Sequence, residues 1–367
     1  MGRKSWTGDA INGRPPMSRR SFLGTAAGGV AGTLAVSGAS GFLLAGCGGK
    51  DDAKAGGSNS LDNVTFLTII PLNLGFISEV LGDVNGRFKQ QGLNVKIQST
   101  RGSAQALQSI LQGSALTTRA GAIETVLHNA QAGSPLVNIG MQWRKSPLGF
   151  VSSPDHPIRQ PSDLRGKKIG IPSKGGTSEI TFNLMMANAG IPLDSVQRQV
   201  TGFSVGTYDL VQKGRVDGYV IGSVETVLFP LQKPDAVVID PSKWVEEGQC
   251  YLTSRRQLDE KRDQLQAYMN VVKATMNDVM NDKANKYMTV IRAVRKKYDF
   301  EELKDDKVAQ GVLQGQVDAW SYNGAQPDLE TVSASWQKVY DELVHAKLIE
   351  AGKNPQEWFT NELVSKT

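Results

Sequence analysis

After residue 61 the chain alternates short apolar runs with longer amphipathic stretches, and this order constrains its fold more than any other feature. "VTFLTII" (64–70) is almost continuously apolar and "LNVKIQ" (93–98) alternates apolar with polar residues, so both runs predict strands. Between them, "SEVLGDVNGRFKQQG" (78–92) has helical spacing and closes on a glycine, a common helix terminator. Because parallel neighbouring strands need a crossover connection, this order predicts a parallel α/β sheet.

The same pattern restarts after residue 153 and then gives way to helices. A short strand, Lys168–Ile171, leads through a Gly-rich loop to a helix from about Thr177 to Ala189, and the alternation continues to "AVVID" (236–240). Beyond Gln257 the pattern is purely that of amphipathic helices. The sequence therefore predicts two α/β lobes followed by a helical C-terminal tail.

The segment before the first strand has the features of an export signal. From Ser18 the order "SRRSFLG" resembles a twin-arginine signal, with Gly24 in place of the usual Lys, and Met17 is the expected translation start. "LAGC", ending at Cys47, resembles a bacterial lipobox, in which the cysteine is lipidated and becomes the mature N-terminus. We therefore expect residues 1–46 to be a lipoprotein signal and residues 47–61 a flexible tether, with the protein anchored by lipid at the outer face of the membrane or in the periplasm. A transmembrane anchor fits the length of the apolar run but not its many glycines.

The net charge of the chain bears on whether it binds nucleic acid, and its cysteine content bears on disulfide formation. The chain carries 41 basic and 36 acidic residues, a net charge of +5. The residues before Cys47 hold five basic groups and one acidic group, so the mature chain has 36 minus 35, or +1. The basic excess belongs to the signal and gives no reason to expect nucleic-acid binding. With Cys47 lipidated, Cys250 has no disulfide partner and is expected to be a buried thiol.

Four stretches, in the order in which they occur, resemble one family of transport proteins. They are "FKQQGLNVKI", "LQSILQGSALTTRAGAIETV", "PSDLRGKKIGIPSKGGTSE" and "LVQKGRVDGYVIGSVET". Together they resemble the substrate-binding proteins of ABC importers, in the branch that contains nitrate-, taurine- and aliphatic-sulfonate-binding proteins and binders of thiamine-pyrimidine precursors. The resemblance covers about residues 62–345 in element order.

The resemblance implies the type II periplasmic-binding-protein fold. In that fold lobe one is interrupted by lobe two, so we expect lobe one at residues 62–153 and 245–367 and lobe two at residues 154–244, joined by two crossing strands. Open α/β sheets bind ligands at the carboxyl ends of their strands, and the expected site is therefore a cleft between the lobes.

The resemblance also implies a function. We expect an extracytoplasmic solute-binding lipoprotein that acts as a monomer, captures a small polar organic ligand such as a sulfonate or taurine, and delivers it to the permease and ATPase subunits of an importer. An alternative ligand is a thiamine-pyrimidine-like or other aromatic nitrogen compound. A pyrimidine-synthase-like enzyme is a further alternative, but that chemistry needs clustered histidines and cysteines, and the chain has only His128, His156 and His345. No metal or cofactor motif is present, so none is expected.

Loops that precede helices supply the first group of candidate ligand contacts. The N–H groups at a helix start favour an anion, glycine lets a ligand approach the backbone, and hydroxyl groups add hydrogen bonds. The candidates of this kind are Gly102, Ser103, Ala104, Gly176, Thr177 and Ser178. Alternatively, the Ser and Thr residues are ordinary N-caps.

Charged and aromatic residues at strand ends supply the second group. Arg119 could bind a sulfonate or carboxylate bidentately, or instead form a salt bridge with Glu124, itself a candidate. Glu225 would suit an amine or a ring N–H, or could be an acid at a helix start. If Arg119 and Glu225 both face the ligand, they favour a molecule with a positive and a negative end or an aminated heterocycle, and nitrate is disfavoured. The remaining candidates, each of which could equally pack in the core, are Phe76, Trp143 and Phe203, together with Asn73 as a hydrogen-bonding side chain.

Overall fold

The computed structural model describes residues 61–133, 136–245, 248–321 and 328–365. Every described residue belongs to a single compact unit. The expected signal, the lipidated Cys47 and all but the last residue of the tether lie outside the described residues.

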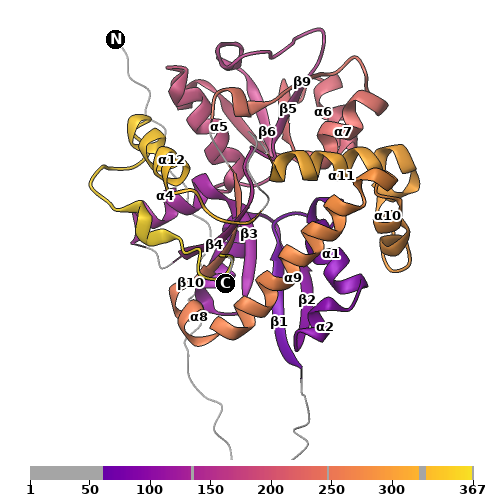
Figure 1. The fold of residues 1–367 in the computed structure, drawn as a ribbon. Coiled ribbons are helices and arrows are strands. Elements are labelled where there is room, and N and C mark those ends of the chain that lie inside the picture. Colours follow the sequence, from indigo (N-terminus) through magenta and orange to yellow (C-terminus); the bar gives the residue numbers. More distant parts are fainter. Residues whose placement is uncertain (1–60, 134–135, 246–247, 322–327, 366–367) are drawn as a thin grey trace, which may run out of the picture. The chain divides into compact units, whose positions relative to one another are not determined.

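The first lobe is built on a mixed five-stranded sheet with the order β2-β1-β3-β10-β4 (Figure 1). Its strands are β1 (Asp62–Thr68), β2 (Leu93–Ser99), β3 (Thr117–Gly121), β4 (Leu136–Trp143) and β10 (Gln249–Ser254). β1 runs parallel to β2 and β3, whereas β10 returns from the second lobe and pairs antiparallel with β3 and β4. The parallel strands are those that the sequence alternation predicts, and the antiparallel insertion of β10 makes the sheet mixed.

Four helices follow the strands of the first lobe among the described residues, namely α1 (Ile77–Val84), α2 (Arg87–Gln90), α3 (Ser103–Gln112) and α4 (Ala122–Ala132). The prediction of one helix over residues 78–92 is wrong, because α1 ends before Asn85 and Gly86 adopts a left-handed φ of 66°. A glycine in that conformation breaks the helix at little steric cost, and the chain restarts as the short α2.

The second lobe has its own mixed sheet, with the order β7-β6-β8-β5-β9. Its elements are β5 (Gly149–Ser152), β6 (Lys168–Ile171), α5 (Thr177–Asn188), β7 (Gln197–Val200), α6 (Asp209–Gln212), β8 (Gly218–Ile221), α7 (Ser223–Gln232) and β9 (Val237–Ile239). β6 is parallel to β7 and β8, and β5 pairs antiparallel with β8 and β9. β5 lies in this sheet although it precedes residue 154, where the sequence places the start of lobe two; the domain limits remain predictions.

The chain crosses between the sheets twice, through residues 144–148 from β4 to β5 and again between β9 and β10. This is the two-lobed periplasmic-binding-protein fold with two crossings that the sequence predicts. The helical tail contains α8 (Arg255–Glu260), α9 (Arg262–Asn281), α10 (Met288–Arg295), α11 (Asp306–Trp320) and α12 (Ser333–His345). Short 3-10 helices are η1 (Leu74–Phe76), η2 (Pro161–Leu164), η3 (Leu193–Ser195), η4 (Val205–Tyr208), η5 (Pro241–Lys243), η6 (Lys283–Asn285), η7 (Glu301–Lys304) and η9 (Pro355–Trp358).

The tail covers the first lobe and also reaches the second. α9 packs against α1, and α12 packs against α4. α11 packs against η1 and β4 of the first lobe and against α7 of the second, so it lies across both lobes (Figure 1). Of the described helices, none is both long enough and apolar enough to cross a bilayer.

The apolar core continues from one lobe into the other. One cluster of buried side chains includes Leu67 and Ile123 of the first lobe together with Phe150 and Met185 of the second. The helices α4 and α5 pack together across this boundary. Cys250 is buried in β10 as expected, with its Sγ 3.7 Å from the carbonyl oxygen of Ala120. The lobes are therefore in direct contact.

Candidate functional site

The loops at the carboxyl ends of the strands meet between the two lobes. A Cβ atom on Gly102, which follows β2, would lie 2.6 Å from the Oγ of Ser173, which follows β6. A Cβ atom on Gly75, which follows β1, would lie 3.6 Å from the Oγ of Ser223, the first residue of α7. The structure thus brings the predicted ligand-binding loops of both lobes together at one place.

Ser103, Thr177 and Glu124 form a direct hydrogen-bonded connection between the lobes, called here the inter-lobe latch. The Thr177 backbone N–H donates to Ser103 Oγ at 3.0 Å, and the Thr177 hydroxyl donates to Glu124 Oε2. The N–H of Gly121 donates to the same Thr177 hydroxyl at 3.2 Å. Because Thr177 starts α5 while its partners lie at the starts of α3 and α4, the latch joins three helix N-termini.

The N-capping alternative for Ser103 and Thr177 is wrong. The N-cap residues of α3 and α5 are Gly102 and Gly176, and neither helix has a side-chain cap hydrogen bond. Ser103 and Thr177 are instead the first helical residues, and their hydroxyl groups face the opposite lobe. Of their neighbours, Ser178 is buried and Ala104 is half-buried on α3.

Glu124 is a carboxyl group with an unusual environment. Its side chain is buried in the latch, and this burial raises its pKa from 4.5 to about 7, although hydrogen bonds from Thr177 and Ser103 oppose the rise. A carboxyl group with such a pKa changes its charge near neutral pH. The contact between the lobes therefore contains a titratable group.

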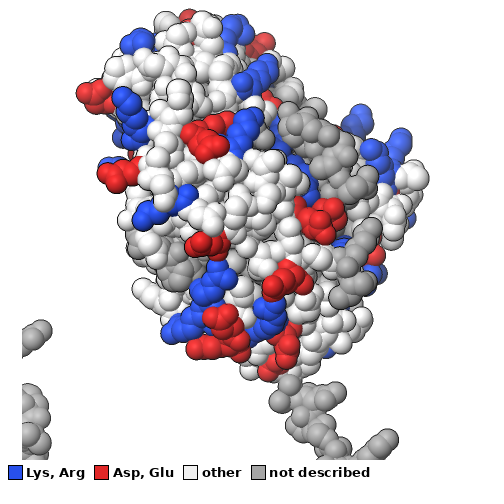
Figure 2. All heavy atoms as spheres, turned by 60° about the vertical axis from the view of Figure 1, so that its left-hand side comes forward, with Lys and Arg blue, Asp and Glu red and all other residues white. Residues whose placement is uncertain are grey.

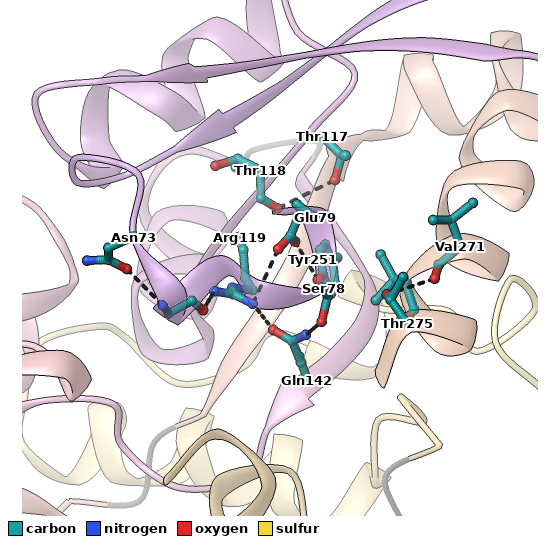
Figure 3. A network of polar contacts seen from close by, with 12 residues as sticks. Asn73, Ser78, Glu79, Thr117, Thr118, Arg119, Gln142, Tyr251, Val271 and Thr275 are labelled. Atoms are coloured by element: carbon teal, nitrogen blue, oxygen red, sulfur yellow. Dashed lines mark hydrogen bonds and ion pairs between the residues drawn. The ribbon is translucent and has the colours of Figure 1, made fainter. Parts of the chain in front are cut away.

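Arg119 lies in a buried polar network beneath the loop that follows β1 (Figure 3). Its guanidinium donates to Gln142 Oε1 and to the carbonyl oxygen of Gly75, and it lies 3.9 Å from Glu79 Oε2. The other Glu79 oxygen accepts a hydrogen bond of 2.6 Å from the Tyr251 hydroxyl. The alternative ion pair with Glu124 is therefore wrong in its partner, because the acidic side chain beside Arg119 is that of Glu79. The contact of Arg119 with Gly75 supports the loop from below.

Glu225 lies in the first turn of α7, at the edge of the second lobe that faces the first. Its side chain is only 9% exposed, and Oε2 has no hydrogen-bond partner within the described part of the chain. Burial raises its pKa to about 7, and the nearby Glu302 adds to the rise. Glu302 itself accepts the N–H of Leu74 at 2.6 Å, which places it beside the loop that follows β1.

The remaining candidates divide between the loops and the core. The Asn73 side chain accepts the N–H of Gly75 at 2.9 Å and so caps η1. Phe76 is buried in the first-lobe core with its ring centre 4.7 Å below the Arg119 guanidinium, and Trp143 is buried at the end of β4. Phe203 is half-buried, and its ring lies close to Gly222 beside Glu225. Of these aromatic residues, Phe203 is the one that lies beside Glu225.

Sequence reasoning missed several polar residues of this region. Glu79, Gln142 and Tyr251 complete the Arg119 network, but each comes from a different element, and sequence spacing cannot reveal such contacts. Ser173 and Ser223 could have been found, because Ser173 lies in the Gly-rich loop before α5 and Ser223 is the first residue of α7, two residues before Glu225. No group of three or more potential metal ligands occurs among the residues that the structure describes.

Comparison with solved structures finds the same fold in several proteins, two of which are described as solute-binding proteins. A protein from Bordetella bronchiseptica RB50 superposes with a TM-score of 0.68 at 20% identity, covering 83% of this chain and 96% of that one. The alkanesulfonate-binding protein SsuA from Xanthomonas axonopodis pv. citri, bound to MOPS, matches with a TM-score of 0.63 at 16% identity over 82% of this chain and 98% of that one. The periplasmic nitrate-binding protein NrtA from Synechocystis PCC 6803 matches with a TM-score of 0.60 at 11% identity over 83% and 87%. At these identities the likeness establishes the fold.

Comparison with curated proteins found no matching sequence. A family model described as "NMT1/THI5 like" matches residues 73–285. This match runs from the loop after β1, through the whole second lobe, to the end of η6 in the tail. It therefore covers more than half of the chain and both sides of the inter-lobe contact. The chain belongs to the NMT1/THI5-like family.

Proposed function

We propose that this protein is an extracytoplasmic solute-binding lipoprotein of an ABC importer, which captures a small organic ligand between its two lobes. The observation that carries the proposal is the meeting of the strand-end loops, with Gly75 and Gly102 on one side and Ser173 and Ser223 on the other. Ligand-binding proteins with two lobes gain affinity because each lobe supplies part of the contacts and the ligand favours the closed arrangement. The hydrogen-bonded latch between Ser103 and Thr177 represents such a closed arrangement.

The charges at this contact favour a ligand that donates hydrogen bonds through nitrogen. Glu225 is buried with an unpartnered oxygen, and a buried carboxyl group gains most from a cationic or N–H donor. The Arg119 guanidinium already contacts Glu79, Gln142 and the Gly75 carbonyl oxygen, and Arg119 is 2% exposed, so it offers little to an anion. An amine or an aminated aromatic ring, stacked near Phe203, therefore fits better than a simple anion.

A sulfonate remains the second candidate. The N-termini of α3, α5 and α7 all face the inter-lobe contact, and unpaired N–H groups at helix starts attract anions. Zwitterions such as taurine would satisfy both features, with the amine at Glu225 and the sulfonate at the helix starts.

The proposals that the protein is exported, anchored by lipid and bound by importer subunits are supported by the sequence features and the family resemblance. Cys47 would carry the lipid, and the described domain would present the ligand as a monomer to permease and ATPase subunits. Figure 2 shows basic and acidic side chains interspersed over one face, a distribution that gives no support to nucleic-acid binding.

A thermal-shift screen of the purified protein tests this proposal. The panel contains taurine, alkanesulfonates, nitrate, aromatic carboxylates and hydroxymethylpyrimidine. A ligand at a hundred times its Kd should add about 2.7 kcal/mol to the free energy of unfolding. We expect stabilisation by hydroxymethylpyrimidine or by taurine and none by nitrate.

The variant Glu225→Gln should weaken binding of the stabilising ligand at least about tenfold, because a charge-assisted hydrogen bond is lost. Glu350→Gln, at an exposed position, is the matched control and should bind as wild type. Stabilisation by an aromatic carboxylate alone, unaffected by Glu225→Gln, would contradict the proposed ligand class. Conversion of any ligand to a product would contradict the binding function itself.

A further inference from the structure

The place where the starts of α3 and α5 meet is filled by a carboxyl group of the chain itself. Glu124, in the first turn of α4, is 2% exposed, and its Oε2 accepts a hydrogen bond from the Thr177 hydroxyl. The N–H of Thr177 and the hydroxyl of Ser103 act on the same carboxyl group. Because Ser103 and Thr177 are the first residues of α3 and α5, the Glu124 carboxyl group lies at the N-termini of two helices other than its own.

These contacts differ from the usual role of an acidic residue in a first helical turn. Such a residue interacts with the N–H groups and the dipole of its own helix. The hydrogen bonds that oppose the rise in the pKa of Glu124 come instead from Ser103 of α3 and Thr177 of α5, and no N–H group of α4 is among them. The carboxyl group therefore takes the hydrogen bonds that a bound oxyanion would take at a helix start.

The surroundings leave no room for a second anion beside this carboxyl group. A Cβ atom on Gly176, the N-cap residue of α5, would lie 2.7 Å from Ser103 Oγ and 2.8 Å from Ser173 Oγ. Contacts this short show that not even a methyl group fits between the two loops. An anion placed there would also be repelled by the Glu124 carboxylate. A solute could therefore bring an acidic group to these helix starts only by displacing Glu124.

We propose that Glu124 is a specificity-determining residue, which occupies the oxyanion position at the starts of α3 and α5 and thereby excludes solutes whose acidic group would bind there. The inference rests on the function proposed above, in which the position is exposed to solutes when the lobes part, since Ser103 and Glu124 belong to one lobe and Thr177 to the other. Of the two ligand classes, it selects the amine or aminated ring and disfavours taurine, whose sulfonate competes with Glu124. Specificity then depends on what the site rejects as well as on what it binds.

Emptying the position should create oxyanion binding that wild type lacks. The probe is methanesulfonate, which carries a sulfonate and no other polar group, and its affinity is measured by titration calorimetry at pH 8, above the pKa of about 7 of Glu124. We expect Glu124→Ala to bind methanesulfonate at least about tenfold more tightly than wild type, because the donors at Ser103 and Thr177 lose their acceptor. Glu124→Ser, which also shortens the side chain, is the second variant and should show the same gain.

Control variants separate occupation of the position from a general effect. Glu124→Gln removes the charge but keeps the position filled, and it should bind methanesulfonate no better than wild type. The location is tested by combining Glu124→Ala with a change at Thr177. Thr177→Ser keeps the hydroxyl and should retain the gained affinity, whereas Thr177→Val removes the hydroxyl and should reduce that affinity at least about tenfold.

The proposal is overturned if Glu124→Ala and Glu124→Ser, shown to be folded by circular dichroism, bind methanesulfonate no better than wild type. An equal gain in Glu124→Gln would contradict occupation of the position, and an equal affinity with Thr177→Val and Thr177→Ser would contradict its location. Failure of the proposed function is a separate result, because it is read from wild type, which would then bind no solute of the screened panel whatever the Glu124 variants do.

Discussion

Replacing Arg119 by Met should destabilise the protein strongly. The guanidinium is 2% exposed and lies 3.9 Å from Glu79, a separation at which two charges interact by about 4 kcal/mol if the effective dielectric constant is about 20. The replacement also leaves the Gly75 carbonyl and Gln142 Oε1 without their donor. Because removal of one partner of a buried pair typically costs about 3–5 kcal/mol, we expect a loss of that size.

The loss of stability in Arg119→Met should depend on pH, because the substitution leaves the Glu79 carboxyl group buried without its cationic partner. Burial raises the pKa of Glu79, and Arg119 and Tyr251 oppose that rise in the intact protein. Without Arg119 the folded state holds its proton to still higher pH, so the destabilisation should grow as the pH rises above the ordinary carboxyl range. A Gln at position 79 carries no charge, and Arg119→Met combined with Glu79→Gln should therefore be more stable than Arg119→Met alone at pH 8.

Urea unfolding measures these differences, with circular dichroism and tryptophan fluorescence recorded together. The two signals must give the same transition, because a chain with two lobes need not unfold in a single step. Glu350→Gln serves as the surface control and should stay within about 0.5 kcal/mol of wild type. An Arg119→Met protein within about 1 kcal/mol of wild type at pH 8 would refute the buried-pair reasoning.

Three further predictions concern the inter-lobe contact. The pKa values of Glu124 and Glu225 are raised from 4.5 to about 7, so the folded chain binds more protons than the unfolded chain in this interval and its stability should fall as the pH rises from 5 to 8. Each of the two carboxyl groups should account for up to about 3 kcal/mol of this fall in the free energy of unfolding. Unfolding of Glu225→Gln measured across the same pH range should show a smaller dependence of stability on pH, and an unchanged dependence would contradict the prediction. Thr177→Val removes the hydroxyl of the latch and should destabilise the protein by about 1–3 kcal/mol. It should also increase the radius of gyration measured by X-ray scattering, and an unchanged radius would argue against a latch. Gly102→Ala should have a similar effect, because the residue has a φ of 146° and its Cβ would lie 2.6 Å from Ser173 Oγ; a wild-type melting temperature would show that the two loops are not in contact.

The order of elements could be read from the sequence because strand and helix periodicity are local properties. The glycine ends of α3 and α4 are local features of the same kind, since Gly113 and Gly133 adopt left-handed φ values of 78° and 58°. The break at Gly86 was missed because the helical spacing of apolar residues continues across it to Phe88. Phe88 is indeed buried, although it belongs to the separate helix α2. The antiparallel position of β10 depends on a long return of the chain, and no local pattern encodes it.

The candidate site was predictable in its loops but not in its contacts. Gly102, Ser103 and Thr177 were identified because they lie at helix starts after strands, and such positions lie at the carboxyl edge of each sheet. The partners of Arg119 were not predictable, because Glu79 and Tyr251 are 40 and 132 residues away in the sequence and meet it only after folding. The raised pKa of Glu225 is likewise a consequence of burial, which cannot be read from the sequence.

Native mass spectrometry of the protein purified under mild conditions from the cells that make it tests the central claim most directly. We predict one small organic molecule bound per chain, retained by wild type and by Glu350→Gln and lost or greatly reduced in Glu225→Gln and Thr177→Val. A chain that carries no molecule, and that gains none when the screened solutes are added, would contradict the account of a receptor that holds a solute between its lobes.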